Sequence, residues 1–143
     1  MQIYGKINFD KREALHSYAS RLFTHQLSRH IEVRVSQKKL GKIHGQVGIE
    51  DYNVLGQPRS FEIEIRASDS LEEKLLTLAH EMVHVRQYCR GQLNEQGNRW
   101  YGRKFDSDEI PYNELPWEIE AEELSNQLYR DYNDTRTSRT NGA

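Results

Sequence analysis

The stretch Ser70–Arg90, SLEEKLLTLAHEMVHVRQYCR, decides the fold because it predicts one long helix with two unlike faces. Ser70 and Glu73 form a capping box, a pattern that marks the beginning of a helix. At about 100° per residue, His80 and His84 share one side of this helix. The opposite side is apolar and consists of Leu75, Leu78, Met82, Val85 and Cys89. We therefore expect the helix to pack its apolar side on a core and to turn both histidines toward a cleft.

The pattern from His80 to His84, HEMVH, is the part of the helix that carries chemistry. Two histidines four residues apart lie one above the other, so one imidazole nitrogen of each can bind the same zinc ion at about 2.0–2.1 Å. Glu81 leans to the side of that ion, where its carboxylate can take a proton from zinc-bound water. We expect one catalytic Zn²⁺ held by His80 and His84, with Glu81 as the general base. The alternative, a pair of core histidines, fits poorly with their position opposite the apolar side.

A catalytic zinc ion needs a third protein ligand, and the segment 116–132 offers several glutamates. Pro116 suits the first turn of a helix, which we expect to run through the whole segment. Glu118 and Glu120 flank the apolar stripe of this helix on either side, so periodicity does not choose between them. Glu123 points away from the core and is most simply a solvated charge.

The chain before Ser70 predicts a helix and then three strands. A capping box of Asp10 and Glu13 begins a helix with a single apolar stripe. Strand character follows in Ile31–Val35, Lys42–Ile49 and Ser60–Ala67. The last of these alternates Phe61, Ile63 and Ile65 with charged residues, which is typical of a half-buried strand.

The segment Gly91–Leu115 has no sustained period, and we interpret it as a long loop of the kind that tends to be functional. Tyr112 lies just ahead of the glutamate helix, where its hydroxyl can donate a hydrogen bond to the oxyanion formed when water attacks a carbonyl. Packing of the tyrosine under the loop is the alternative. The segment 134–143 is predicted to be a flexible C-terminal tail.

These elements predict one α+β domain over residues 1–133. It would contain an N-terminal helix, a three-stranded, mainly antiparallel sheet, the HExxH helix, a long loop and a C-terminal helix that bears the glutamates. The chain of 143 residues has no apolar run long enough to span a membrane, no signal sequence and one cysteine. We therefore expect a cytoplasmic protein without a membrane partner, and a monomer as the default.

Charge is unevenly distributed, since residues 1–44 carry nine Lys and Arg against three Asp and Glu. Such a basic segment can meet a nucleic acid or an acidic partner. Charges spread over solvated faces are the simpler interpretation, so we do not expect nucleic acid to be a partner.

The HEMVH helix is followed 34 residues later by an E-x-x-A-E pattern at residues 118–122, and this pair resembles the gluzincin metallopeptidases. The chain is similar above all to the small ImmA/IrrE-like and phage-encoded members, over about residues 60–130. The resemblance implies a zincin-like fold in which Glu118 is the third zinc ligand. It also implies that Glu122 steadies a histidine ligand, at a position where the family more often has Asp or Asn.

The resemblance further implies a zinc-dependent endopeptidase that hydrolyses peptide bonds in a protein or peptide substrate with metal-activated water. In related zincins the edge strand before the HExxH helix receives an extended substrate, so Phe61, Ile63 and Ile65 would belong to the substrate-binding strand. One alternative is a SprT-like DNA-associated protease, but those proteins generally use a third histidine and none follows His84. Another is a zinc-binding interaction module without activity, which would have no need of Glu81.

Overall fold

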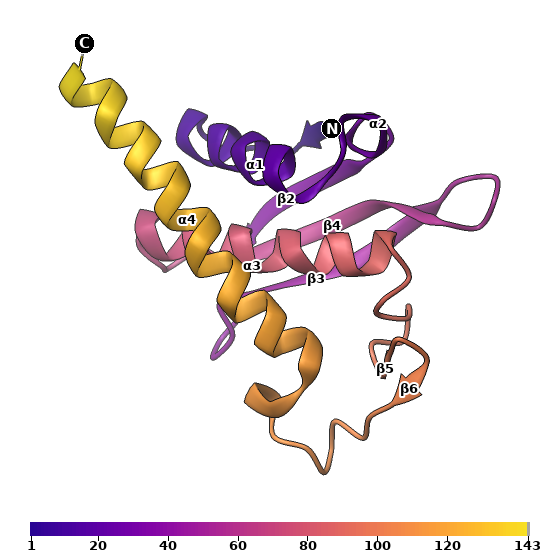
Figure 1. The fold of residues 1–143 in the computed structure, drawn as a ribbon. Coiled ribbons are helices and arrows are strands. Elements are labelled where there is room, and N and C mark those ends of the chain that lie inside the picture. The colour runs from indigo at the N-terminus through magenta and orange to yellow at the C-terminus, as the bar shows by residue number, and fades with distance from the viewer. Residues whose placement is uncertain (143) are drawn as a thin grey trace.

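A four-stranded mixed sheet forms one layer of the fold (Figure 1). The computed structural model describes the backbone of residues 1–142 and the side chains of residues 1–138. The strand order is β1-β2-β4-β3, with β1 at Gln2–Tyr4, β2 at Glu32–Lys38, β3 at Gly45–Tyr52 and β4 at Pro58–Arg66. β1 with β2 and β2 with β4 are parallel pairs, and only β3 with β4 is antiparallel. The α+β class is therefore confirmed, whereas the prediction of three mainly antiparallel strands is wrong.

The connection between β2 and β3 explains this difference. Residues 39–44 cross the end of the sheet, so that β2 and β3 lie on opposite sides of β4 although they are neighbours in sequence. β3 and β4 then form a hairpin, which makes them antiparallel and leaves β2 parallel to β4. Hydrophobic alternation reports which face of a strand is buried but not which strand lies beside it.

β4 is an interior strand, and this overturns its predicted role in binding substrate. Both of its edges are already paired, one with β2 and one with β3. Phe61, Ile63 and Ile65 each have 0% of their surface exposed and belong to the core. The strand that leaves one edge unpaired next to the HExxH helix is β3.

The described residues also form four α-helices, and three of these share one core with the sheet. α1 spans Phe9–Leu22, α2 His25–Ser28, α3 Leu71–Cys89 and α4 Pro116–Gly142. α3 lies on β3 and β4 and contacts both α1 and α4, and α4 crosses it in Figure 1. The other face of the sheet is polar, as the alternating burial of β2 and β4 indicates. Among the described residues, no helix is long and apolar enough to cross a membrane.

The N-cap predicted from the sequence is observed at α3 but not at α1. Ser70 and Glu73 exchange both hydrogen bonds of a capping box, as predicted. The N-cap of α1 is instead Asn8, whose side chain accepts from the backbone N–H of Lys11, so the box predicted at Asp10 is wrong. Asparagine is as good an N-cap as aspartate, and the sequence offered both within three residues.

α4 extends well beyond the end predicted near residue 132. The flexible tail expected from residue 134 is instead helical as far as Gly142, while the side chains of residues 139–143 lie outside the described part of the chain. Tyr132 is buried at the middle of this helix, and its hydroxyl donates to the carbonyl of Asp10. The polar sequence after Tyr132 predicts a frayed helix end, but α4 continues through this segment to Gly142.

The segment between α3 and α4, predicted to be a long loop, contains short elements of regular secondary structure. It contains a short hairpin of β5 (Arg99–Trp100) and β6 (Arg103–Lys104), and a 3-10 turn η1 at Tyr112–Glu114. A second small core lies beneath it, made of Leu93, Leu115 and Trp117, with Tyr88, Trp100, Phe105 and Ile110 packed against them. This core holds the segment against the beginning of α4.

Candidate metal centre

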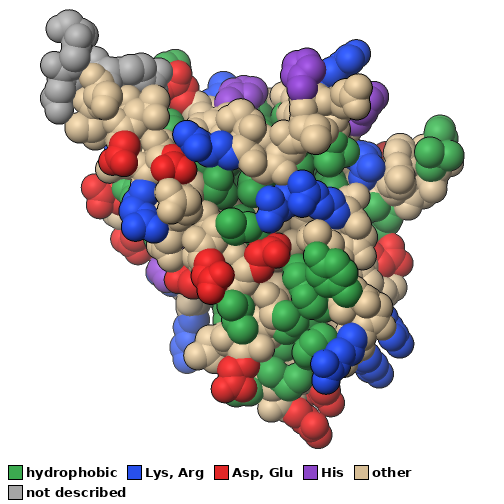
Figure 2. Space-filling view, viewed as in Figure 1, with side chains coloured by type: hydrophobic (Ala, Val, Ile, Leu, Met, Phe, Trp, Pro, Cys, Tyr) green, Lys and Arg blue, Asp and Glu red, His purple; other side chains and the backbone are tan. Residues whose placement is uncertain are grey.

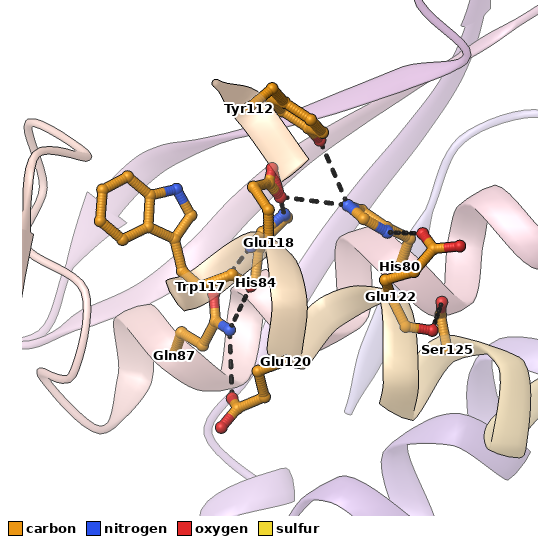
Figure 3. A network of polar contacts seen from close by, with 9 residues as sticks. All are labelled: His80, His84, Gln87, Tyr112, Trp117, Glu118, Glu120, Glu122 and Ser125. Carbon is orange, nitrogen blue, oxygen red and sulfur yellow. Dashed lines mark hydrogen bonds and ion pairs between the residues drawn. The ribbon is translucent and has the colours of Figure 1, made fainter. Parts of the chain in front are cut away.

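Three potential metal ligands from two helices meet in one place (Figure 3). His80 and His84 come from α3, and Glu118 comes from the first turn of α4. One Glu118 carboxylate oxygen lies 3.2 Å from His80 Nε2 and 2.6 Å from His84 Nε2. The ligand atoms of the three residues all lie within 4.8 Å of one another. Two imidazoles and one carboxylate are a donor set that zinc uses in catalytic sites, so the residues fit that ion.

The packing of α4 on α3 determines which glutamate reaches the histidines. Ala121 is fully buried between the helices, and its small side chain allows their close approach. Glu118 lies one turn before Ala121 and points at the histidines, with 6% of its surface exposed. Glu120 faces another way and pairs with Arg86 at 3.7 Å and with the Gln87 amide at 3.1 Å. The structure therefore brings Glu118, and not Glu120, to the histidine pair.

The electrostatics of the cluster favour an anionic Glu118. Burial opposes ionisation of this carboxyl group, but hydrogen bonds with His80 and His84 outweigh it and lower the pKa of Glu118 to about 2. Burial by itself would lower the pKa of His84, yet its contact with Glu118 raises that pKa overall. A charged carboxylate is thus available at this position throughout the physiological range.

Glu81 lies on the buried side of the cluster. Its side chain is 6% exposed, and burial raises the pKa of its carboxyl group, while His84 and His80 oppose that rise. A Cβ atom built on Gly45 in β3 would lie 3.6 Å from Glu81 Oε1, so the carboxylate faces the edge strand across a narrow gap. Glu81 is therefore positioned between the histidines and β3.

A cleft of about 830 Å³ runs over the cluster. Its walls come from the beginning of β3, from α3 and from the first turns of α4, and they include His80, Glu81, His84 and Glu118. Tyr88, Leu93 and Trp117 make part of the wall apolar. A cleft of this size, with a few convergent polar groups, has the character of a ligand site.

Tyr112 and Glu122, both singled out from the sequence, also reach the cluster. The hydroxyl of Tyr112 lies 3.5 Å from His80 Nε2, and although 65% of the residue's surface is exposed, desolvation of the hydroxyl and its contact with Glu118 raise its pKa. Glu122 Oε2 lies 3.9 Å from His80 Nδ1, which is ion-pair distance, and its side chain is 72% exposed. Phe61, Ile63 and Ile65 do not line the cleft.

Sequence reasoning gave no role to Gln87, although it lies on the same side of α3 as the histidines. Gln87 is fully buried, and its side-chain oxygen lies 2.7 Å from His84 Nδ1. Its amide nitrogen donates to the carbonyl of Trp117 at 3.0 Å and to Glu120 at 3.1 Å. A polar residue three positions after the second histidine, on the histidine side of the helix, was the available signal.

A second group of acidic and histidine side chains, His44, Asp69 and Glu73, lies near the beginning of α3. Arg66 donates to Asp69 at 2.7 Å and lies 3.1 Å from His44 Nδ1. A fixed guanidinium charge among these groups takes the place that a cation would need, so this group is an ion-pair network.

Comparison with known proteins gave no match to any family model, to any curated protein or to any solved structure.

Gly45 offers a test of how closely β3 must approach α3. A Cβ at this position would lie 2.4 Å from Thr77 Cγ2 and 3.0 Å from the Glu64 carbonyl oxygen. Gly45→Ala is therefore expected to lower the free energy of unfolding by about 1–3 kcal/mol, the usual cost of overpacking. Gly48→Ala is the matched control on the same strand, because its Cβ would meet nothing within 4 Å. Equal stability of the two variants in chemical denaturation would show that β3 does not press on α3.

Proposed function

We propose that this chain is a zinc-dependent endopeptidase of the gluzincin type, with His80, His84 and Glu118 as the zinc ligands. The observation that carries the proposal is the convergence of two Nε2 atoms on one buried carboxylate, with a second buried carboxylate, Glu81, beside them in the same cleft. A structural zinc site is closed by four protein ligands and does not need a neighbouring carboxylate such as Glu81. Three ligands that open onto a cleft suit a catalytic ion better.

The reaction would divide its tasks among these residues. When bound, the zinc ion supplies a Lewis acid that polarises the substrate carbonyl and makes water more acidic. Glu81 accepts the proton from the attacking water and passes it to the leaving amine. Tyr112 donates a hydrogen bond from its hydroxyl to the oxygen on which negative charge develops. Glu122, whose carboxylate lies 3.9 Å from His80 Nδ1, acts on the orientation of that imidazole through its charge and not through a direct hydrogen bond.

An extended substrate peptide would pair with β3 and not with β4. β3 has one free edge, and its beginning, from Gly45 to Val47, lines the cleft beside Glu81. An extended peptide can add to such an edge through main-chain hydrogen bonds, which bind without demanding a particular sequence. This arrangement favours an unfolded segment of a protein as the substrate.

Metal analysis of the purified chain, followed by digestion of casein with and without a chelator, tests the proposal. We expect one zinc ion per chain and proteolysis that stops when the metal is removed and returns when zinc is restored. Zinc at the site without any hydrolysis would favour the binding module instead.

The SprT-like alternative makes a separate prediction about nucleic acid. On the face shown in Figure 2, lysine and arginine side chains are interspersed with acidic ones and form no continuous basic area. Because the basic excess is confined to residues 1–44, we expect no DNA binding of consequence at about 150 mM salt, where non-specific affinities are typically 10⁻⁴–10⁻⁶ M. An anisotropy titration that gave a sub-micromolar dissociation constant at that salt concentration would revive the DNA-associated alternative.

A further inference from the structure

Gln87 connects two ligands that lie 34 residues apart in the sequence. Its oxygen contacts His84 Nδ1 at 2.7 Å, and its nitrogen donates to the carbonyl of Trp117, the residue next to Glu118. The same nitrogen donates to Glu120 at 3.1 Å. Gln87 has no exposed surface, so bulk water does not compete for these bonds. Figure 3 shows the amide between the His84 ring and the first turn of α4.

These contacts fix which way round the Gln87 amide lies. A carbonyl and a carboxylate can only accept hydrogen bonds, so the two groups on α4 must face the amide nitrogen. The amide oxygen then faces His84, and because an oxygen of this kind also only accepts, His84 Nδ1 must carry a hydrogen. The ring nitrogen that remains for a metal is Nε2, the one that faces Glu118.

We infer that Gln87 is a positioning residue that holds His84 with its Nδ1–H bonded and its Nε2 directed at the metal, and that it does so only when α4 is docked. This inference rests on the proposed zinc site. Ligating histidines depend on such a partner for ring orientation, and its loss typically lowers metal affinity by about 10–100-fold. Here the partner is itself held by the helix that supplies the third ligand, so one side chain joins the assembly of both.

The test compares three variants of the full chain. Gln87→Leu keeps the approximate volume but removes every hydrogen bond, and we expect a 10–100-fold loss of zinc affinity in competition with a chelator. Gln87→Glu keeps an acceptor for His84 Nδ1–H but loses the donor to Trp117 and Glu120, so its zinc affinity should lie between those of Gln87→Leu and the native chain. Leu78→Ala empties a buried position on the apolar side of α3 and is the control for stability alone. It should lower the melting temperature without a comparable loss of zinc affinity.

A second readout does not depend on zinc or on activity. In the metal-free protein, we expect a His84 Nδ1–H resonance that is protected from exchange with solvent, and that is lost in Gln87→Leu and kept in Leu78→Ala. Unchanged zinc affinity in Gln87→Leu would overturn the inference, as would a zinc loss that follows melting temperature equally in all three variants. If the native chain binds no zinc, the proposed function fails, and the protected resonance still decides whether Gln87 orients His84.

Discussion

Glu81→Gln is expected to lower the rate of peptide hydrolysis by about 10²–10⁴-fold, the usual contribution of a general base, while the zinc content stays at one ion per chain. Glutamine keeps the shape of the side chain but cannot accept the proton. Glu81 is not one of the three grouped ligands, so its replacement leaves that set intact. The fold should also persist, because the substitution replaces a buried carboxyl, whose pKa is raised by burial, with a neutral amide of the same size.

The measurement is turnover of casein or of a quenched peptide, together with the zinc content and melting temperature of the same preparation. Glu72→Gln is a matched control, since Glu72 lies exposed in the first turn of the same helix and outside the cleft. Turnover in Glu81→Gln equal to that of the control would show that another group takes the proton and would remove the mechanism proposed above.

The second large effect is expected from Glu118→Ala. Removing this carboxylate leaves two histidines, a set that binds zinc poorly, so purified protein should contain little zinc and show no hydrolysis. Glu122→Ala should instead keep the ion and lose about 10-fold in affinity or activity, the low end of the range for groups that orient a ligand. Glu122 lies 3.9 Å from His80 and is largely exposed, which is why the smaller effect is expected. Zinc content and turnover of both variants separate these cases.

Glu123→Ala is the matched control for this pair, because Glu123 is exposed on the same helix and outside the cleft. It should keep native zinc content and turnover. Near-normal zinc in Glu118→Ala, combined with loss of zinc in Glu122→Ala, would reverse the roles of the two glutamates.

The features that could be predicted from the sequence are those that depend only on residues close together in the chain. The capping box at Ser70 and the face shared by His80 and His84 depend only on helix geometry, and both appear as expected in α3. The choice between Glu118 and Glu120 was not local. It depends on how α4 rotates when Ala121 packs on α3, and periodicity placed both glutamates at the margin of the stripe.

Strand pairing could not be predicted for a related reason. A three-residue strand such as β1 carries too little pattern to be recognised, and β1 is defined only by its parallel pairing with β2. The hydrophobic alternation of the predicted strand Ser60–Ala67 is compatible with an edge position or an interior position in the sheet. The crossing of residues 39–44 decides between them, and with that crossing the expected substrate strand changes from β4 to β3.

The position of Glu118 at the beginning of α4 has a consequence for the order of events during synthesis. During synthesis, both histidines and Glu81 leave the ribosome before α4 does. α4 then has to pack on α3 and on α1, where the Tyr132 hydroxyl donates to the carbonyl of Asp10 across 122 residues of sequence. Contacts of such long range form late in folding. A nascent chain therefore contains Glu81 without the complete set of candidate ligands, and under the proposed function it would hydrolyse no peptide before α4 docks.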